Sequence, residues 1–352
     1  MAAAANPGAR LVEPIHPFDT AALGRYLRER IGEFGGELAV EQFQGGQSNP
    51  TYRITAGGRR YVLRRKPPGR LLPSAHAIDR EYRVMSALAG TDVPVARMHA
   101  LCEDESVIGT AFYLMEHIEG RILWDPTLPG MTAVERAAHY DELNRVIAAL
   151  HRVDYASVGL AGFGRAGHYV ERQIARWGKQ YQSAGIDGIP AMDQLIEWLP
   201  AHLPAGDETT IVHGDFRLDN VIFHPSEPRI LAVLDWELAT LGHPLSDFAY
   251  QVMAWRLTPQ QFRGLKGADL AKLGIPSEQE YVAAYCQRTA RPGIDDFEFY
   301  LIFNLFRIAA ILHGVLARAM QGNAASSDAI ATGGRARLLA DAAWEMAQRQ
   351  EH

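Results

Sequence analysis

Three polar residues interrupt a series of short apolar segments between residues 211 and 237, and their spacing constrains this chain more than any other feature. Asp215 ends one apolar segment, Asn220 opens the next five positions later, and Asp235 ends a third segment 15 positions beyond Asn220. A short hairpin brings the ends of such segments together. The sequence therefore predicts a site where three oxygen-bearing side chains converge.

These three side chains match the requirements of phosphoryl transfer. That reaction needs a carboxylate to orient or deprotonate a hydroxyl, and hard oxygen ligands to hold magnesium against nucleotide phosphates. The spacing Asp-x-x-x-x-Asn, followed by an Asp at a strand end, is also that of the catalytic loop and metal-binding Asp of kinases. Taken alone, the same residues also fit turn and cap positions.

The surrounding residues carry a family resemblance. Residues 213–220 read His-Gly-Asp-x-x-x-x-Asn, and residues 234–237 read Leu-Asp-Trp-Glu. This chain resembles the aminoglycoside phosphotransferase and choline kinase family from the loop near Gly45 to about Met320. The resemblance implies a protein-kinase-like fold that binds ATP between two lobes.

The resemblance also implies a role for each residue of the motif. Asp215 is similar to the family's catalytic Asp, while Asn220 and Asp235 resemble its Mg²⁺ ligands. His213 would brace the catalytic loop. Asp247, in Gly-His-Pro-Leu-Ser-Asp-Phe-Ala, resembles an acidic residue that family members carry after the metal-binding Asp, and we interpret it as structural.

A glycine-containing loop in the first part of the chain is a candidate phosphate-binding loop. It comprises Gly45, Gly46, Gln47, Ser48 and Asn49 and lies between two expected strands. Glycines allow backbone N–H groups to approach phosphate oxygens closely. The loop resembles a shortened family phosphate loop, although without the downstream motif it would fit a plain hairpin turn.

Arg64 is the candidate phosphate-pairing cation. In Tyr61-Val62-Leu63-Arg64, strand alternation places Val62 and Arg64 on one face, as in the Val-Ala-Ile-Lys segment of kinases. Here Arg replaces Lys, which changes the geometry of the charge, so Lys66 on the same face remains an alternative. Glu81 on the following helix is expected to pair with Arg64, or else to be a surface residue.

The segment 114–120 occupies the position of the hinge in the family. The resemblance implies that the backbone around Glu116 and Ile118 recognises adenine. Side chains at these positions need not take part.

Hydrophobic periodicity predicts an α+β fold of two lobes. An amphipathic helix over residues 19–34, capped by Asp19, precedes an antiparallel meander, and from about Thr132 the period becomes helical except around 210–236. We expect a nucleotide-binding lobe at 1–118 and a mainly helical lobe with the catalytic loop and acceptor site at 119–352. The first lobe is predicted to contain strands at 37–43, 51–55, 60–65, 97–101 and 112–118 and a helix at about 75–88.

Composition excludes several classes of protein. Lys and Arg total 35 against 41 Asp and Glu, a net charge of −6, so no nucleic-acid partner is expected. Cys102 and Cys286 lack metal-ligand spacing, and the first residues resemble no signal peptide. The apolar segment Phe299 to Met320 contains four interrupting polar residues and predicts a buried core helix, not a membrane span. These features favour a cytoplasmic protein.

Two other sequence features each have two interpretations. Residues 162–167 fit Gly-x-Gly-x-x-Gly, but no strand or βαβ series is expected around them, so a loop between helices is favoured over a dinucleotide site. A basic cluster could attract phosphorylated ligands, although a solvated strand face is the preferred interpretation. It comprises Arg53, Arg59, Arg60, Arg64, Arg65, Lys66 and Arg70.

The leading hypothesis is an ATP- and Mg²⁺-dependent phosphotransferase acting on a hydroxyl of a small molecule. A nucleotide-binding regulatory pseudokinase is the alternative, and a metal-dependent hydrolase using His213, Asp215, Asp235 and His243 is a third. Candidate acceptors are a hydroxyacyl-CoA, an amino alcohol, a sugar and an aminoglycoside. The hydroxyacyl-CoA acceptor is implied by a resemblance: residues 61–79 and 242–244 are similar to the kinase-like portion that accompanies acyl-CoA dehydrogenases in some proteins. The sequence gives no indication of oligomeric state.

Overall fold

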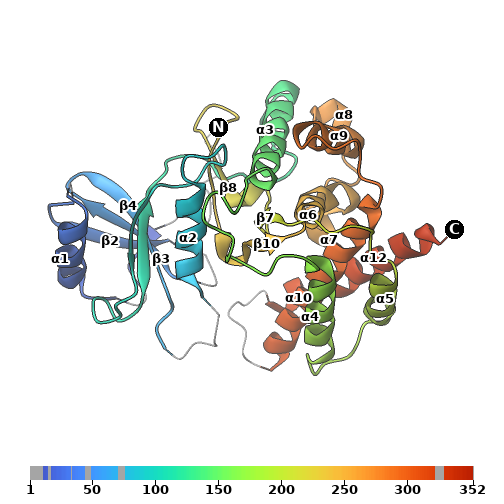
Figure 1. Ribbon diagram of the computed structural model, residues 1–352, viewed down its shortest axis with the longest axis horizontal. Coiled ribbons are helices and arrows are strands. Elements are labelled where there is room, and N and C mark those ends of the chain that lie inside the picture. Colours follow the sequence, from blue (N-terminus) through green and yellow to red (C-terminus); the bar gives the residue numbers. More distant parts are fainter. Residues whose placement is uncertain are drawn as a thin grey trace. The chain divides into compact units, whose positions relative to one another are not determined.

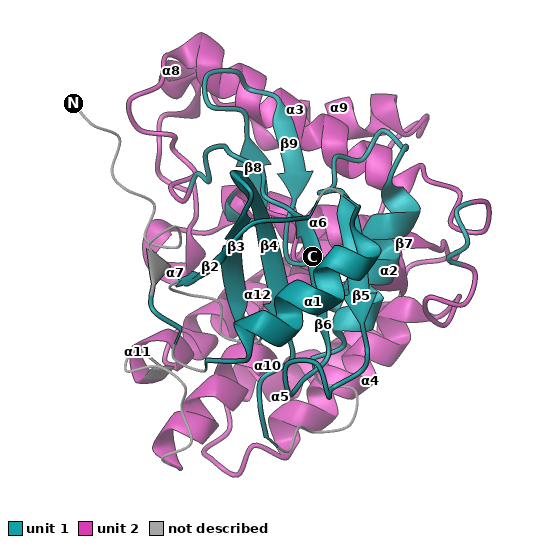
Figure 2. Cartoon of the chain, turned by 90° about the vertical axis from the view of Figure 1, so that its left-hand side faces the viewer, with its two compact units in different colours: residues 1–123, 158–160, 219–239 teal, residues 124–157, 161–218, 240–352 magenta. Residues whose placement is uncertain are grey.

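The computed structural model describes residues 11–14, 17–32, 34–43, 49–69, 76–321 and 329–351. The chain divides into two compact units (Figure 2). Unit 1 comprises residues 1–123, 158–160 and 219–239, and unit 2 comprises 124–157, 161–218 and 240–352. We expected one continuous first lobe ending at residue 118, whereas unit 1 also includes two later segments of the chain.

A six-stranded antiparallel sheet forms the centre of unit 1 (Figure 1). Its strand order is β1-β2-β3-β4-β6-β5, and the expected meander and the α+β class are confirmed. The strands are β1 (Leu11–Val12), β2 (Leu38–Phe43), β3 (Thr51–Ala56), β4 (Arg59–Arg65), β5 (Met98–Cys102) and β6 (Phe112–Glu116).

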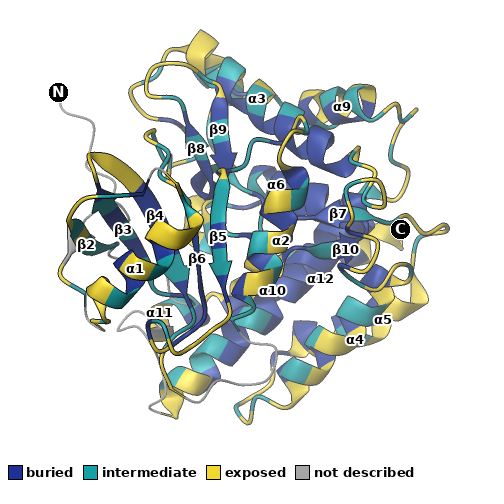
Figure 3. Ribbon diagram, turned by 60° about the vertical axis from the view of Figure 1, so that its left-hand side comes forward, coloured by how far each residue is buried: buried dark blue, intermediate teal, exposed yellow. Residues whose placement is uncertain are grey.

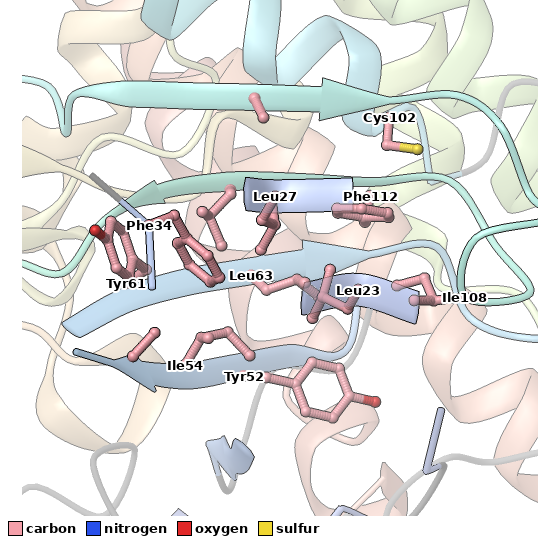
Figure 4. Close-up of a cluster of buried hydrophobic side chains, with 13 residues drawn as sticks. Leu23, Leu27, Phe34, Tyr52, Ile54, Tyr61, Leu63, Cys102, Ile108 and Phe112 are labelled. Atoms are coloured by element: carbon pink, nitrogen blue, oxygen red, sulfur yellow. The ribbon is translucent and has the colours of Figure 1, made fainter. Parts of the chain in front are cut away.

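Helix α1 (Thr20–Arg30) covers one face of this sheet. It begins where the side chain of Asp19 accepts a hydrogen bond from the backbone N–H of Ala22, at 2.9 Å, as expected of an N-cap. Leu23 and Leu27 are one helical turn apart and fully buried against the strands (Figure 4). Each buried Leu contributes about 1.5–3 kcal/mol to stability, so this packing fixes α1 on the sheet.

Strand alternation separates the two faces of β4. Tyr61 and Leu63 join the apolar cluster beneath α1, whereas Val62 and Arg64 line a cavity. Helix α2 (Ile78–Leu88) buries Glu81 together with its apolar residues, and its predicted range agrees with the structure from Ile78 onward.

The hairpin of β8 (Val221–Phe223) and β9 (Ile230–Val233) belongs to unit 1 (Figure 2). In the chain it comes long after β6, which ends at Glu116. Arg121 forms a β-bridge with Phe223. A Cβ atom at Gly120 would lie 2.3 Å from the carbonyl oxygen of Phe223, so only glycine permits this close approach. The short helices η2 (Leu218–Asn220) and η3 (Trp236–Leu238) flank the hairpin.

Unit 2 is mainly helical and packs around α10 (Phe297–Met320). By length and hydropathy this helix could cross a membrane, but 83% of its most apolar 18-residue window is buried inside the fold, as expected of a core helix. Exposed residues gather on the outer faces of α4 and α5 (Figure 3).

The other elements of unit 2 are α3 (Ala133–His151), α4 (Tyr169–Gln182), α5 (Pro190–Ala201), β7 (Thr210–Val212), β10 (Thr240–Gly242), α6 (Pro244–Arg256), α7 (Pro259–Phe262), α8 (Leu270–Leu273), α9 (Glu278–Arg288), α11 (Ala329–Gly333) and α12 (Ala336–Gln350). Strands β7 and β10 pair antiparallel; β7 precedes the segment 213–220, and β10 precedes α6.

Candidate functional site

A cavity of about 470 Å³ lies within unit 1. Its walls combine apolar side chains, among them Val62, Met115 and Ile222, with charged and amide side chains. A largely apolar cavity with a few polar groups is typical of small-molecule sites. The sequence-predicted site residues that line it are Asn49, Arg64, Glu81, Glu116, Ile118, Asn220 and Asp235.

Four other predicted residues are not among the described residues that line this cavity. Asp215 belongs to unit 2 and is described with that unit below. Gly45, Gly46 and Ser48 lie outside the described residues.

Arg64 is a cation of the cavity wall with three carboxylates around it. Its Nε lies 3.3 Å from Oε2 of Glu81, the pairing that the sequence suggested, and its Nη2 lies 3.2 Å from Oδ1 of Asp235. The carboxylate of Glu237 is 3.5 Å from the same Nη2. Burial lowers the pKa of Arg64, but Tyr113 and these carboxylates raise it by more, so the pKa lies above its ordinary value. The guanidinium therefore stays charged. Lys66, the alternative, is not among the described residues of the cavity wall.

Glu81 is buried and accepts hydrogen bonds from two further side chains. The hydroxyl of Tyr113 donates to Oε2 at 2.9 Å, and the amide of Asn49 donates to Oε1 at 3.0 Å. Burial raises the pKa of Glu81 to about 7, although Arg64 and Tyr113 act in the opposite direction. At neutral pH the carboxyl group is therefore close to its titration midpoint.

Asn49 is the last residue of the candidate phosphate loop and is only 2% exposed. Besides donating to Glu81, it contacts Nδ1 of His76 through Oδ1 at 3.0 Å. The side chain thus connects the end of the loop to Glu81. The sequence pattern missed both Tyr113 and His76, because neither belongs to a motif.

The proposed metal ligands are held by the β8–β9 hairpin. The backbone N–H of Leu234 donates to the carbonyl of Asn220 at 2.8 Å, which fixes the two strand ends beside each other. Asp235 adopts the left-handed conformation, with φ 64° and ψ 58°, which an ordinary residue adopts at a cost of about 1–2 kcal/mol. The hairpin turns this side chain toward Arg64.

Asn220 and Asp235 are a suitable donor pair for Mg²⁺. Magnesium prefers oxygen ligands and is usually bound by one or two carboxylates together with substrate phosphates. Among the residues that the structure describes, no three or more His, Cys, Asp or Glu side chains are grouped to hold a metal ion. The carboxylate and amide oxygens of Asp235 and Asn220 fit a magnesium ion that accompanies a nucleotide.

The candidate catalytic loop begins at His213 in unit 2 and is anchored by Asp247. Its carboxylate accepts the backbone N–H groups of His213, at 2.7 Å, and Gly214, at 2.8 Å, and lies 3.2 Å from Nε2 of His151. Burial acts to raise the pKa of Asp247, but these donors lower it overall. Arg307 donates from α10 to the carbonyl of Gly214. Asp247 thus has the loop-holding contacts of a structural residue.

Asp215 contacts two residues that the sequence pattern did not identify. The hydroxyl of Tyr250 donates to its Oδ1, and Nε of Arg217 lies 3.3 Å from the same oxygen. Tyr250 lies three residues after Asp247 on α6, a spacing that places two side chains on one helix face. That spacing was the available signal for Tyr250.

The glycine motif at residues 162–167 lies in a loop before α4, and turns precede it. A Cβ atom at Gly164 would lie 2.4 Å from Oγ1 of Thr240. The glycine serves close packing in unit 2, and the interpretation as a loop between helices is confirmed.

Comparison with known proteins identifies relatives over nearly the whole chain. Residues 39–288 match the model of the phosphotransferase enzyme family. Acyl-CoA dehydrogenase family member 10 from Mus musculus is 48% identical over 348 residues, which are 98% of this chain and 32% of the mouse protein. The chain spans 32% to 46% of the length of the curated relatives to which it was compared, so it corresponds to one portion of them.

Two solved structures have the same fold. A protein from Ralstonia eutropha JMP134, whose name assigns it to the aminoglycoside phosphotransferases, is 56% identical with a TM-score of 0.88, covering 95% of this chain and 99% of that chain. Aminoglycoside phosphotransferase APH(4)-Ia, crystallised with AMP-PNP and hygromycin B, is 18% identical with a TM-score of 0.59, covering 92% and 99%. The expected kinase-like fold is confirmed.

Proposed function

Because the chain belongs to the phosphotransferase enzyme family, we propose that it is a kinase that transfers the γ-phosphate of ATP to a hydroxyl of a small molecule. The observation that carries the proposal is the cavity of unit 1, where Arg64 and Glu81 line the same walls as Asn220 and Asp235. These are the residue types that phosphoryl transfer requires for holding phosphates and magnesium.

The residues of unit 1 bind and orient the nucleotide. Val62, Met115 and Ile222 provide apolar surface for a flat base, and the backbone of Glu116 and Ile118 lies along the same cavity. Arg64 pairs with the phosphates. Asn220 and Asp235 would hold Mg²⁺, which would neutralise charge on the nucleotide phosphates.

Asp215 in unit 2 is the proposed catalytic residue. Its carboxylate orients the acceptor hydroxyl and accepts the proton released when that hydroxyl attacks phosphorus. Tyr250 and Arg217 both contact Oδ1, so they restrict the rotation of the carboxylate. A regulatory pseudokinase would not need this arrangement, because nucleotide binding alone requires no oriented Asp215.

For the acceptor we propose a hydroxyacyl-CoA ester ahead of an amino alcohol, a sugar or an aminoglycoside. The identity to a portion of acyl-CoA dehydrogenase family member 10 supports this order. The charges near Asp215 support it too, since Arg217 contacts that residue and Arg307 contacts the adjacent Gly214. Cationic acceptors favour acidic surroundings, and here the two arginines offset the charges of Asp215 and Asp247.

The test is an ATP-consumption screen over the four acceptor classes with wild type and Asp215→Asn. We expect one class to stimulate ATP consumption and Asp215→Asn to lower the rate about 10²- to 10⁴-fold, with AMP-PNP affinity nearly unchanged. Asp341→Asn, at an exposed position on α12, is the matched control and should behave as wild type. Turnover by Asp215→Asn within about tenfold of wild type would refute the catalytic role. AMP-PNP binding without acceptor-dependent turnover would favour the regulatory alternative.

A further inference from the structure

A second cavity, of about 660 Å³, lies within unit 1 beside the end of α1. Tyr61 lines this cavity while its neighbour Val62 lines the nucleotide cavity, so the two cavities open on opposite faces of β4. Both share Arg60 and residues 116, 117 and 119, and the last three lie at or just after the end of β6. The proposed function does not use the second cavity.

Four arginines from three separate segments line this second cavity. They are Arg30 at the end of α1, Arg59 and Arg60 at the start of β4, and Arg97 just before β5. Glu116 and Glu119 are the acidic residues of the described wall, which leaves an excess of two positive charges. A solvated strand face would spread its charges along one strand, whereas these arginines come from positions 30 to 97 and surround one hollow.

Two histidines in the same wall respond to this positive charge. Burial and then Arg97 lower the pKa of His99, while Glu116 raises it. Burial, Arg60 and Arg53 lower the pKa of His117, with Glu119 acting in the opposite direction. In both cases the arginines act together with burial against the protonated form, which indicates a positive potential in the cavity.

Two of these arginines form ion pairs at the protein surface. Nη2 of Arg60 lies 2.9 Å from Oε2 of Glu119, but both side chains are exposed, and exposed pairs contribute little. Arg30 lies 3.6 Å from the neighbouring Glu29. Arg97 is exposed at the cavity wall, and its guanidinium has the fork geometry that binds phosphate oxygens in a bidentate manner.

We propose that this second cavity is a binding site for a phosphorylated small molecule that carries at least two negative charges. Arg59, Arg60 and Arg97 bind its phosphate oxygens, and the aromatic side chain of Tyr61 forms part of the wall. The volume suits a ligand of metabolite size. Because residues 116, 117 and 119 line both cavities, a ligand here contacts the segment that also borders the nucleotide cavity.

The test is a calorimetric titration of the full chain with inorganic pyrophosphate. Arg97→Gln should weaken the binding at least tenfold and Arg97→Lys should weaken it less, because lysine keeps the charge. Arg25→Gln is the matched control, since Arg25 is an exposed arginine of α1 that is not part of the described cavity wall. It should bind pyrophosphate as wild type does.

A further variant separates this site from the nucleotide cavity. Binding that persists in Arg64→Ala and is lost in Arg97→Gln places the anion in the second cavity. Binding that is lost in Arg64→Ala and persists in Arg97→Gln places it in the nucleotide cavity and overturns the proposal. Failure of wild type to bind millimolar pyrophosphate also overturns it. Neither result bears on the kinase activity, which is measured independently with Asp215→Asn.

Discussion

The Asp247→Asn substitution tests most directly how the catalytic loop is held. Asp247 offers two oxygens to three donors, namely the backbone N–H groups of His213 and Gly214 and the ring of His151. Asn has one acceptor oxygen and one amide donor in the same space. One of the two buried N–H groups must therefore face another donor.

The expected cost follows from these contacts. A buried N–H without an acceptor costs about 1–3 kcal/mol, and replacing the remaining charge-assisted bond by a neutral one costs about 1 kcal/mol more. We expect Asp247→Asn to lower the free energy of unfolding by about 2–4 kcal/mol. His151 can adapt by changing its tautomer, so it adds little to this cost.

The acid dependence provides a second signature of the same contacts. The folded-state pKa of Asp247 lies below its ordinary value of 3.8, so its contribution to stability is present above that value and is lost as the pH falls through the folded pKa. Asn does not titrate. The stability difference between wild type and variant should therefore be constant near neutral pH and shrink in acid.

Urea unfolding measures the global effect, and hydrogen exchange of the peptide covering residues 211–216 measures the local one. We expect faster exchange of the His213 and Gly214 amides in the variant and no change in Asp341→Asn. A loss below about 0.5 kcal/mol, the range of ordinary surface substitutions, together with unchanged exchange, would refute the reasoning.

Two further substitutions test other contacts of the site. Tyr250→Phe removes the hydroxyl that donates to Asp215. Because a hydrogen bond to a charged group is lost, we expect kcat to fall about tenfold with little change in the KM for ATP. An unchanged kcat would contradict the positioning role of Tyr250. Glu81→Gln tests the buried carboxyl group, whose folded pKa of about 7 exceeds the ordinary value of 4.5. The stability that this group contributes is therefore present at acid pH and is lost as the pH rises toward 7. The nucleotide-free wild type should lose about 2–3 kcal/mol relative to the variant between about pH 5 and pH 8, and parallel urea-unfolding curves over that range would contradict it.

The sequence predicted features that depend on local spacing. Alternation along β4 correctly separated Tyr61 from Val62 and Arg64, and the Asp19 cap marked the start of α1. The helix ends at Arg30, earlier than the expected residue 34, because Ile31 is extended and its N–H closes the last turn on Leu27. Such ends depend on packing more than on periodicity.

Contacts between distant segments were beyond the sequence pattern. Tyr113, on a strand, and His76, before α2, complete the contacts of Glu81 and Asn49, yet neither follows from residue spacing. The return of residues 219–239 to unit 1 depends on Gly120, whose missing side chain admits the carbonyl of Phe223. The sequence alone does not show why residue 120 is glycine. The reason is the close approach of β8, which the structure shows.

The division of the chain gives the two halves of the motif separate structural supports. Asp215 is held within unit 2 by Tyr250 and by the loop contacts of Asp247, while Asn220 and Asp235 are held within unit 1 by their hairpin and by Arg64. Damage to one support does not remove the contacts of the other. Substitutions around Asp215 should therefore change the rate of transfer, and substitutions around Asp235 should change nucleotide and magnesium affinity. If both sets changed both quantities equally, the two supports would have to be energetically coupled, which the contacts within each unit do not require.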